Sequence, residues 1–309
     1  MRFPEPLRGV LRSDTTAPQP LALFRIGIAL VALIQAGVLW THRDLLLAEF
    51  GLVPWIISGP MTDPLLVKIS DVAAVLQPLG VGSDGVVAMV LLLHAAAATA
   101  LLAGWHTRIA GTLAWLTWLP LKNTGFLFTY GLGSLLLIGL FYCMVMPVGR
   151  AWSLDQWRKG DGGANDEWVA FSVIVLRIHI CIVYGAAGVS KALGEQWWTG
   201  DAIWRALSLP QFQQFDPAPL LAVTPVLQAA AIASILLQLT YPVLVWTRLR
   251  PIAVFFTELM HLGIALFLGL WLFSLVMMVF NAGAFGESLW RAIASRWNPR
   301  SGGVSWERR

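Results

Sequence analysis

Long apolar runs with almost no charges are the feature that most limits how this chain can fold. Of the 309 residues, 57% are hydrophobic and only 12% are charged, whereas an average soluble domain has roughly 25% charged residues. Several runs reach the roughly 20 residues that an α-helix needs to cross a bilayer. Because backbone groups in hydrocarbon must bond to one another, such runs fold as helices. The composition therefore predicts an all-α integral membrane protein, a polytopic helical bundle.

The apolar runs also predict where the membrane-crossing segments lie. The first six cover about 20–40, 84–104, 108–121, 130–148, 168–190 and 221–246, and a longer last run covers 251–289. Gly263, Gly269 and Gly283 interrupt that last run. It is therefore either one tilted helix or a tight pair of short helices.

Basic residues favour one orientation of these spans. With the N-terminus in the cytoplasm, nine Lys or Arg residues fall in inner segments and five in outer segments, before the basic tail is counted. That tail also belongs inside, which requires an even number of crossings. We therefore expect about eight crossings in the inner (cell) membrane, with the last run folded near Gly269. Cytoplasmic tails at 1–19 and 291–309 would flank a transmembrane domain at 20–290.

Two of the outer segments, 43–80 and 194–220, are amphipathic rather than simply polar. They either lie flat on the outer surface and cover a cavity, or form ordinary interfacial loops. The weak basic excess is explained by topology, so membrane lipids are expected partners and nucleic acid is not. The two cysteines fall inside apolar segments and predict buried free thiols.

Lys191 is the most informative of the polar residues in the apolar runs. It ends the run 168–190, where a charge is costly and a neutral amine is a usable base. The alternative is that its side chain extends to the lipid headgroups and anchors the helix end. Arg177, Tyr184 and Lys191 are spaced seven apart and share one helix face. Gly188, near that face, would let another helix or a flat ligand approach closely.

Glu258 and His261 are three residues apart in the last apolar run, so they are neighbours on a helix surface. A Glu-x-x-His pair binds metal in helical bundles only with further carboxylates and a second such pair. The sequence has one pair, so no metal is expected, and the carboxylate can instead orient His261. Arg25 and Arg177 are candidate counter-ions of Glu258, and His94 is expected to make an interhelical hydrogen bond.

Several motifs together resemble a known family. A-G-V-S-K at 187–191, followed by a pair of tryptophans and an acidic amphipathic segment, resembles a motif of the vitamin K-dependent γ-glutamyl carboxylases. The wider similarity is to the bacterial HTTM proteins, which share only the membrane part of that enzyme. It covers about 20–285 and includes L-A-L-F-R-I-G-I-A-L (21–30), K-N-T-G-F-L-F (122–128) and V-M-P-V-G-R-A-W-S-L-D (145–155).

The resemblance implies specific roles. Lys191 matches the family lysine that deprotonates vitamin K hydroquinone, and His261 matches a family histidine, so both are candidate catalytic residues. Reduced vitamin K or a related quinol is the implied cofactor, and its candidate binding residues are Tyr184, Gly188, Arg177 and Glu258.

The departures from the family restrict this prediction. Ser190 replaces the first lysine of the family pair, no histidine lies in 122–130, and only about 20 residues follow the last apolar run. The favoured function is therefore a quinol-linked oxidation or carboxylation by an enzyme, with a peptide or protein as the candidate second substrate. The alternative is a non-catalytic membrane factor for maturation or export of a secreted peptide or lipid.

Overall fold

The computed structural model describes residues 17–63, 65–125, 130–159 and 166–286. Every regular element in these ranges is helical, so the predicted all-α architecture is confirmed. The predicted tail at 291–309 lies outside the described residues, as does the tail at 1–19 except for its last three residues.

Long helices account for most of the described chain. Eight of them have 15 residues or more: α2 (Gln19–Thr41), α6 (Ser83–Ala103), α7 (Thr107–Thr124), α8 (Gly131–Val145), α10 (Asp166–Ala192), α13 (Thr224–Leu244), α14 (Arg250–Leu268) and α15 (Trp271–Phe285). Five helical segments in the described ranges are long and apolar enough to cross a membrane, namely 19–41, 83–103, 167–192, 218–244 and 250–268. Eight crossings therefore remain a prediction.

The last apolar run is a pair of helices and not one tilted helix. α14 ends at Leu268, Gly269 has a positive φ of 68°, and α15 begins at Trp271. Glycine adopts this left-handed conformation without the steric penalty of a Cβ atom. α14 and α15 then pack against each other. The break predicted near Gly269 is present in the structure.

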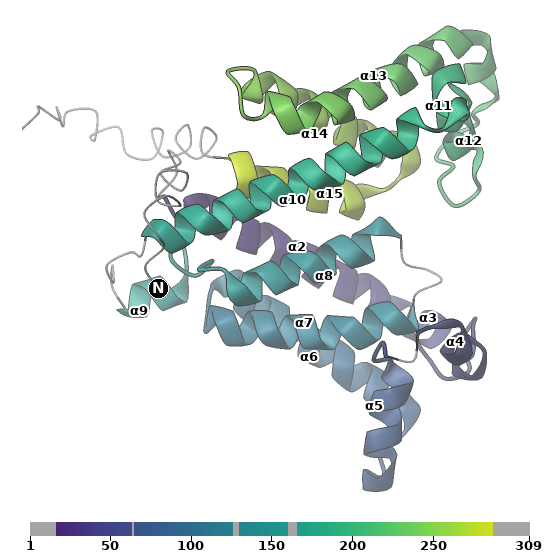
Figure 1. Cartoon of the computed structure of the whole chain (residues 1–309). Coiled ribbons are helices and arrows are strands. Elements are labelled where there is room, and N and C mark those ends of the chain that lie inside the picture. The colour runs from purple at the N-terminus through teal and green to yellow at the C-terminus, as the bar shows by residue number, and fades with distance from the viewer. Residues whose placement is uncertain (1–16, 64, 126–129, 160–165, 287–309) are drawn as a thin grey trace, which may run out of the picture.

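The long helices form two layers (Figure 1). We call α2, α6, α7 and α8 the first layer, and α10, α13 and α14 the second layer. α15 lies between them and packs on α2, α8, α10 and α14. Its contact with α2 is close because Gly283 faces Phe24, where an added Cβ atom would lie 2.9 Å from the ring. Small residues permit such close approach of membrane helices.

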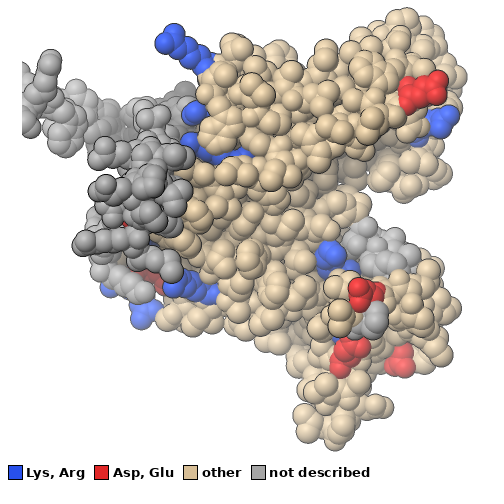
Figure 2. All heavy atoms as spheres, in the orientation of Figure 1, with Lys and Arg blue, Asp and Glu red and all other residues tan. Residues whose placement is uncertain are grey.

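Short helices occupy the two predicted amphipathic segments. The segment 43–80 contains α3 (Arg43–Leu46), α4 (Trp55–Met61), α5 (Ile69–Leu76) and η1 (Gln77–Leu79). The segment 194–220 contains α11 (Glu195–Thr199), α12 (Asp201–Ser208) and the start of η2 (Ala218–Val223). Figure 1 shows α3 to α5 and α11 to α12 at the same end of the molecule, opposite α9 (Leu154–Lys159). In the view of Figure 2, Lys, Arg, Asp and Glu lie toward these two ends and leave the middle uncharged, as expected for a band in contact with lipid.

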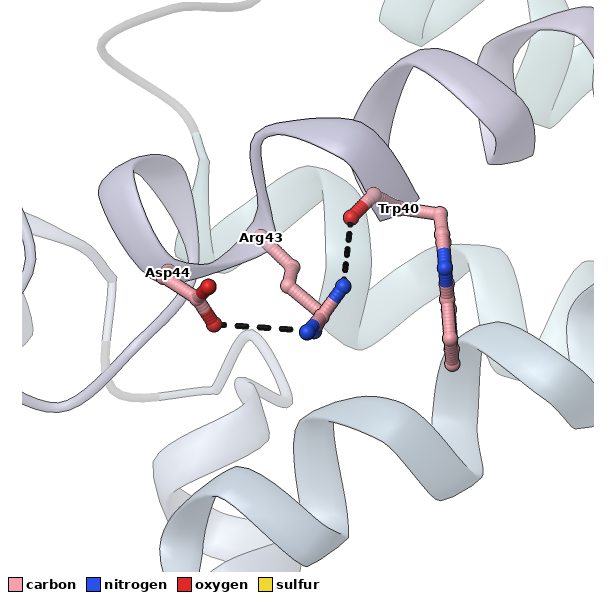
Figure 3. A network of polar contacts seen from close by, with 3 residues as sticks. All are labelled: Trp40, Arg43 and Asp44. Atoms are coloured by element: carbon pink, nitrogen blue, oxygen red, sulfur yellow. Dashed lines mark hydrogen bonds and ion pairs between the residues drawn. The ribbon is translucent and has the colours of Figure 1, made fainter.

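The end of α2 shows how one of these boundaries is held (Figure 3). The guanidinium of Arg43 lies 4.8 Å from the centre of the Trp40 ring and donates to the Trp40 carbonyl at 3.0 Å. The carboxylate of Asp44 lies 3.5 Å from the same guanidinium. Tryptophan and arginine are both favoured at the interface between membrane and water.

The opposite end is held by Asp155. Its carboxylate accepts from the backbone N–H groups of His106 and Thr107, at 2.8 Å each, at the start of α7. A carboxylate at a helix N-terminus satisfies otherwise unpaired donors and complements the helix dipole. Arg25 is fully buried nearby, donates to the carbonyl of Trp152 and interacts electrostatically with Asp155. Asp155, and not the expected Glu258, is thus the acid beside Arg25.

Candidate functional site

Lys191 lies in the last turn of α10 and is half-buried. Its Nζ donates to Oε1 of Gln238 on α13 at 3.0 Å and lies 4.8 Å from the centre of the Trp197 ring. Gln238 is itself buried and donates to the sulfur of Met260 on α14 at 3.4 Å. A glutamine carbonyl and an aromatic face both favour a positively charged ammonium group. Lys191 therefore points into the protein and is held there.

His261 lies on α14 and has only 2% of its surface exposed. Its Nε2 is 2.8 Å from the hydroxyl of Tyr184 on α10, and its ring lies beside Phe273 of α15. Nδ1 has no hydrogen-bond partner among the residues that the structure describes. Lys191 and His261 share no direct hydrogen bond, but Gln238, which accepts from Lys191, also donates to Met260, the residue before His261.

Asn281 of α15 connects the remaining groups. Its Nδ2 donates to the Tyr184 hydroxyl at 3.0 Å, and its Oδ1 accepts from the hydroxyl of Tyr241 on α13 at 2.6 Å. The carboxylate of Glu258 interacts with the same amide. These side chains form what we call the polar cluster: Tyr184, Lys191, Gln238, Tyr241, Glu258, His261 and Asn281.

Four of the six sequence-predicted site residues meet in this cluster, namely Tyr184, Lys191, Glu258 and His261. Arg177 lies about 10 Å further along α10 from Tyr184, where it donates to the Ala284 carbonyl at 2.8 Å and stacks on Phe285. The close approach at Gly188 is filled by α13, because an added Cβ atom would lie 2.8 Å from the backbone nitrogen of Leu239. A helix and not a ligand covers this glycine.

Three members of the cluster were missed by sequence reasoning: Gln238, Tyr241 and Asn281. All three are uncharged and lie in long apolar runs. The available signal was the spacing of Gln238 and Tyr241, which are three residues apart and so share a helix face.

The polar groups of the first layer are arranged differently. His94 of α6 approaches the carbonyl of Ala114 at 3.1 Å and the hydroxyl of Thr117 at 3.0 Å, both on α7. The expected interhelical hydrogen bond of His94 is thus confirmed. Within the described ranges, no three His, Cys, Asp or Glu side chains come together as metal ligands would.

Comparison with known proteins adds one match. The profile of the HTTM domain matches residues 74–290. No curated protein and no solved structure matches the chain. The matched range includes the whole polar cluster and begins after α2.

Proposed function

Because the chain belongs to the HTTM domain family, we propose that it is an integral membrane enzyme of the vitamin K-dependent carboxylase-like group. In this proposal it binds reduced vitamin K or a related quinol at the polar cluster. Lys191 takes a proton from the quinol hydroxyl, and oxygen-dependent oxidation or carboxylation of a second substrate, such as a peptide, follows.

The observation that carries the proposal is the inward position of Lys191. Its amine bonds to Gln238, within electrostatic range of His261, instead of extending into water. Ionisable groups in membrane segments are costly and mark functional sites more often than structural ones. Gathering seven polar side chains from four apolar helices is therefore easier to explain by chemistry than by stability alone.

The surroundings of Lys191 also define what the reaction requires. The Trp197 ring and the Gln238 carbonyl favour the ammonium form, which cannot accept a proton. A bound quinol that displaces the Trp197 ring would remove one of these contacts and exclude water. Lys191 then acts as a base from its neutral form.

The position of the cluster supports an outward-facing reaction. Lys191 lies at the end of α10 from which α11 and α12 follow, opposite α9 (Figure 1). We place this end outside the inner membrane and both termini in the cytoplasm, following the distribution of basic residues.

A second candidate function is a non-catalytic membrane factor that assists maturation or export of a secreted peptide or lipid. The contacts of Lys191 with Gln238 and Trp197 favour it, since a purely structural lysine would be held in the same way. The segments 43–80 and 194–220 would then provide the surface for the partner.

Quinone epoxide formation separates the two candidates. The purified protein in lipid nanodiscs would be given reduced vitamin K and oxygen, and epoxide would be measured by chromatography. Wild type should form epoxide and Lys191→Ala should not. Lys122→Ala is a matched control because Lys122 is also a half-buried lysine in the last turn of a helix. If wild type forms no epoxide with any of several quinols, the proposal that the protein is an enzyme is wrong. If Lys191→Ala forms as much epoxide as wild type, the proposal that Lys191 is the base is wrong.

A further inference from the structure

The hydrogen bonds around Asn281 determine which side chains of the polar cluster are donors and which are acceptors. The amide oxygen accepts from Tyr241, and the amide nitrogen donates to the oxygen of Tyr184. In the reverse orientation, the hydroxyl proton of Tyr241 would have no acceptor among the described residues. These two hydrogen bonds therefore determine how the amide is oriented, with its oxygen toward Tyr241 and its nitrogen toward Tyr184.

The hydroxyl of Tyr184 then decides which nitrogen of His261 carries a proton. Its oxygen accepts from Asn281, and its other hydrogen-bond neighbour in the described chain is Nε2 of His261. If Tyr184 donates to Nε2, that contact is satisfied and Nδ1–H alone is unpaired. If Nε2 carried the proton, both the hydroxyl proton and the Nδ1 lone pair would be buried without a partner, which is less favourable. A doubly protonated ring would bury a positive charge in a side chain that is only 2% exposed, which is costly.

The neutral ring therefore presents an Nδ1–H group with no protein partner. His261 is 2% exposed, and Nδ1 lacks a hydrogen bond among the described residues. Buried donors are nearly always paired, and an unpaired one needs an explanation such as a bound group. We propose that His261 is a neutral hydrogen-bond donor that binds an acceptor oxygen of the ligand, a carbonyl or a phenolate. Tyr184 and Asn281 are the positioning residues that keep its proton on Nδ1.

In this assignment, Lys191 and His261 have different roles in the reaction. The proton of the quinol hydroxyl moves to the neutral amine of Lys191, which becomes an ammonium group. The electron pair of the broken O–H bond stays on the ring oxygen, and the resulting phenolate accepts from Nδ1–H of His261. A fixed donor aimed at a developing negative charge stabilises that charge in a site without water. The identity of the ligand as a quinol rests on the proposed function, whereas the donor assignment rests on the hydrogen bonds alone.

The protonation state of His261 can be measured without any substrate. ¹⁵N NMR of protein labelled at histidine distinguishes Nδ1–H from Nε2–H, and His261→Gln identifies the signal. Wild type should show Nδ1–H with Nε2 as acceptor. Tyr184→Phe removes only a hydroxyl and should give a mixture of the two forms. Tyr241→Phe, which removes a hydroxyl one step further from the ring, should leave Nδ1–H predominant. An Nε2–H or doubly protonated ring in the wild type would overturn the assignment.

Binding of a matched pair of probes tests the ligand class. The compound 2,3-dimethyl-1,4-naphthoquinone offers two acceptor oxygens and no donor, and 2,3-dimethylnaphthalene has the same ring system without them. In nanodiscs, the quinone should shift the Nδ1 signal and the hydrocarbon should not. His261→Phe and Asn281→Leu should each weaken quinone binding by about tenfold, the loss of one hydrogen bond, and should leave hydrocarbon binding unchanged. Equal affinity of wild type and His261→Phe for the quinone would overturn the proposal.

These measurements separate failure of this inference from failure of the proposed function. If wild type binds the quinone through Nδ1–H but forms no epoxide, the donor role of His261 is supported and the proposed oxidation is wrong. If the protein forms epoxide while His261 carries its proton on Nε2, the proposed enzymatic function is supported and the assignment of Nδ1–H as the donor is wrong.

Discussion

The two layers of the molecule hold their buried polar groups in opposite ways. In the first layer, Arg25 donates to the Trp152 carbonyl and His94 bonds to the Ala114 carbonyl and a hydroxyl of the same helix. Each bonds mainly to backbone, although Nε and Nη1 of Arg25 and Nε2 of His94 have no hydrogen-bond partner among the described residues. In the second layer and α15, polar side chains bond mostly to one another, as Tyr184 does to His261 and Asn281. Backbone partners fix helices, whereas side-chain partners can exchange for a ligand.

Two helices of the second layer, α13 and α14, are less well covered than α2, α6 and α10. Half of the residues in the most apolar part of α2 are buried within the protein, compared with 17% for the segment 218–244 and 22% for α14. Most residues of the helices that carry Gln238 and His261 are thus at least partly exposed. This difference predicts that a lipid-soluble ligand reaches the polar cluster from the membrane past α13 and α14, whereas the first layer supports the fold. Four substitutions test the division.

The largest effect is expected for Lys191→Ala. It should lower the rate of epoxide formation by about 10³-fold, or about 4 kcal/mol, because general base catalysis is lost. Its free energy of unfolding should change little, since Lys191 lies at a helix end and is half-buried. Rate assays and thermal unfolding on the same preparation measure both. A variant that unfolds easily but retains its rate per folded molecule would show that Lys191 belongs to the scaffold.

Asp155→Ala should have the opposite profile. It removes the acceptor for two backbone N–H groups and the hydroxyl of Thr107 at the start of α7. We expect a loss of about 3 kcal/mol in the free energy of unfolding, because three partly buried or exposed hydrogen bonds to a charged group are lost. The signals of His261 in ¹⁵N NMR should not move. Altered His261 signals in folded Asp155→Ala would contradict the separation of the two layers.

Gly283→Val tests the contact through which α15 joins the first layer. The new side chain would meet the ring of Phe24 and should cost about 2 kcal/mol of stability. Gly37→Val is the control, because a Cβ atom at Gly37 meets nothing within 4 Å. Thermal unfolding of the pair should therefore differ clearly. Equal midpoints would show that α15 and α2 are not in close contact.

His94→Leu should have the smallest effect. The contacts of Nδ1 with the Ala114 carbonyl and the Thr117 hydroxyl are lost, while the apolar surroundings accept leucine, so we expect about 1 kcal/mol of destabilisation. Epoxide formation should remain at the wild-type rate. A large loss of rate with an intact fold would place the functional site, or a part of it, in the first layer.

Much of the fold could be predicted because hydrocarbon imposes simple requirements on length and hydropathy. The break at Gly269 and the interhelical bond of His94 follow from the same reasoning. Asn281 was missed because one amide hardly changes the hydropathy of an apolar run. The partner of Arg25 was missed for another reason. Trp152 is 127 residues away in sequence and presents its carbonyl from a left-handed conformation, with φ of 49°. No periodicity carries such information.

Within the site, the sequence located Tyr184, Lys191, Glu258 and His261, but not their uncharged neighbours Gln238, Tyr241 and Asn281. The spacing of Tyr184 and Lys191 was sufficient to place them on one face. Gln238 and Tyr241 come from α13, and only the packing of α13 across Gly188 brings them to that face.

The left-handed turn at Gly269 has a consequence for the order of assembly. It makes α14 and α15 a hairpin, so Glu258, His261 and Asn281 arrive at the bundle together. Because synthesis proceeds from the N-terminus, α10 and α13 are made first. Tyr184 then lacks both of its hydrogen-bond partners until the hairpin docks. The last step of biogenesis thus closes the site and satisfies its polar groups at the same moment. A misplaced hairpin leaves unpaired polar groups in the membrane, which disfavours the wrong arrangement.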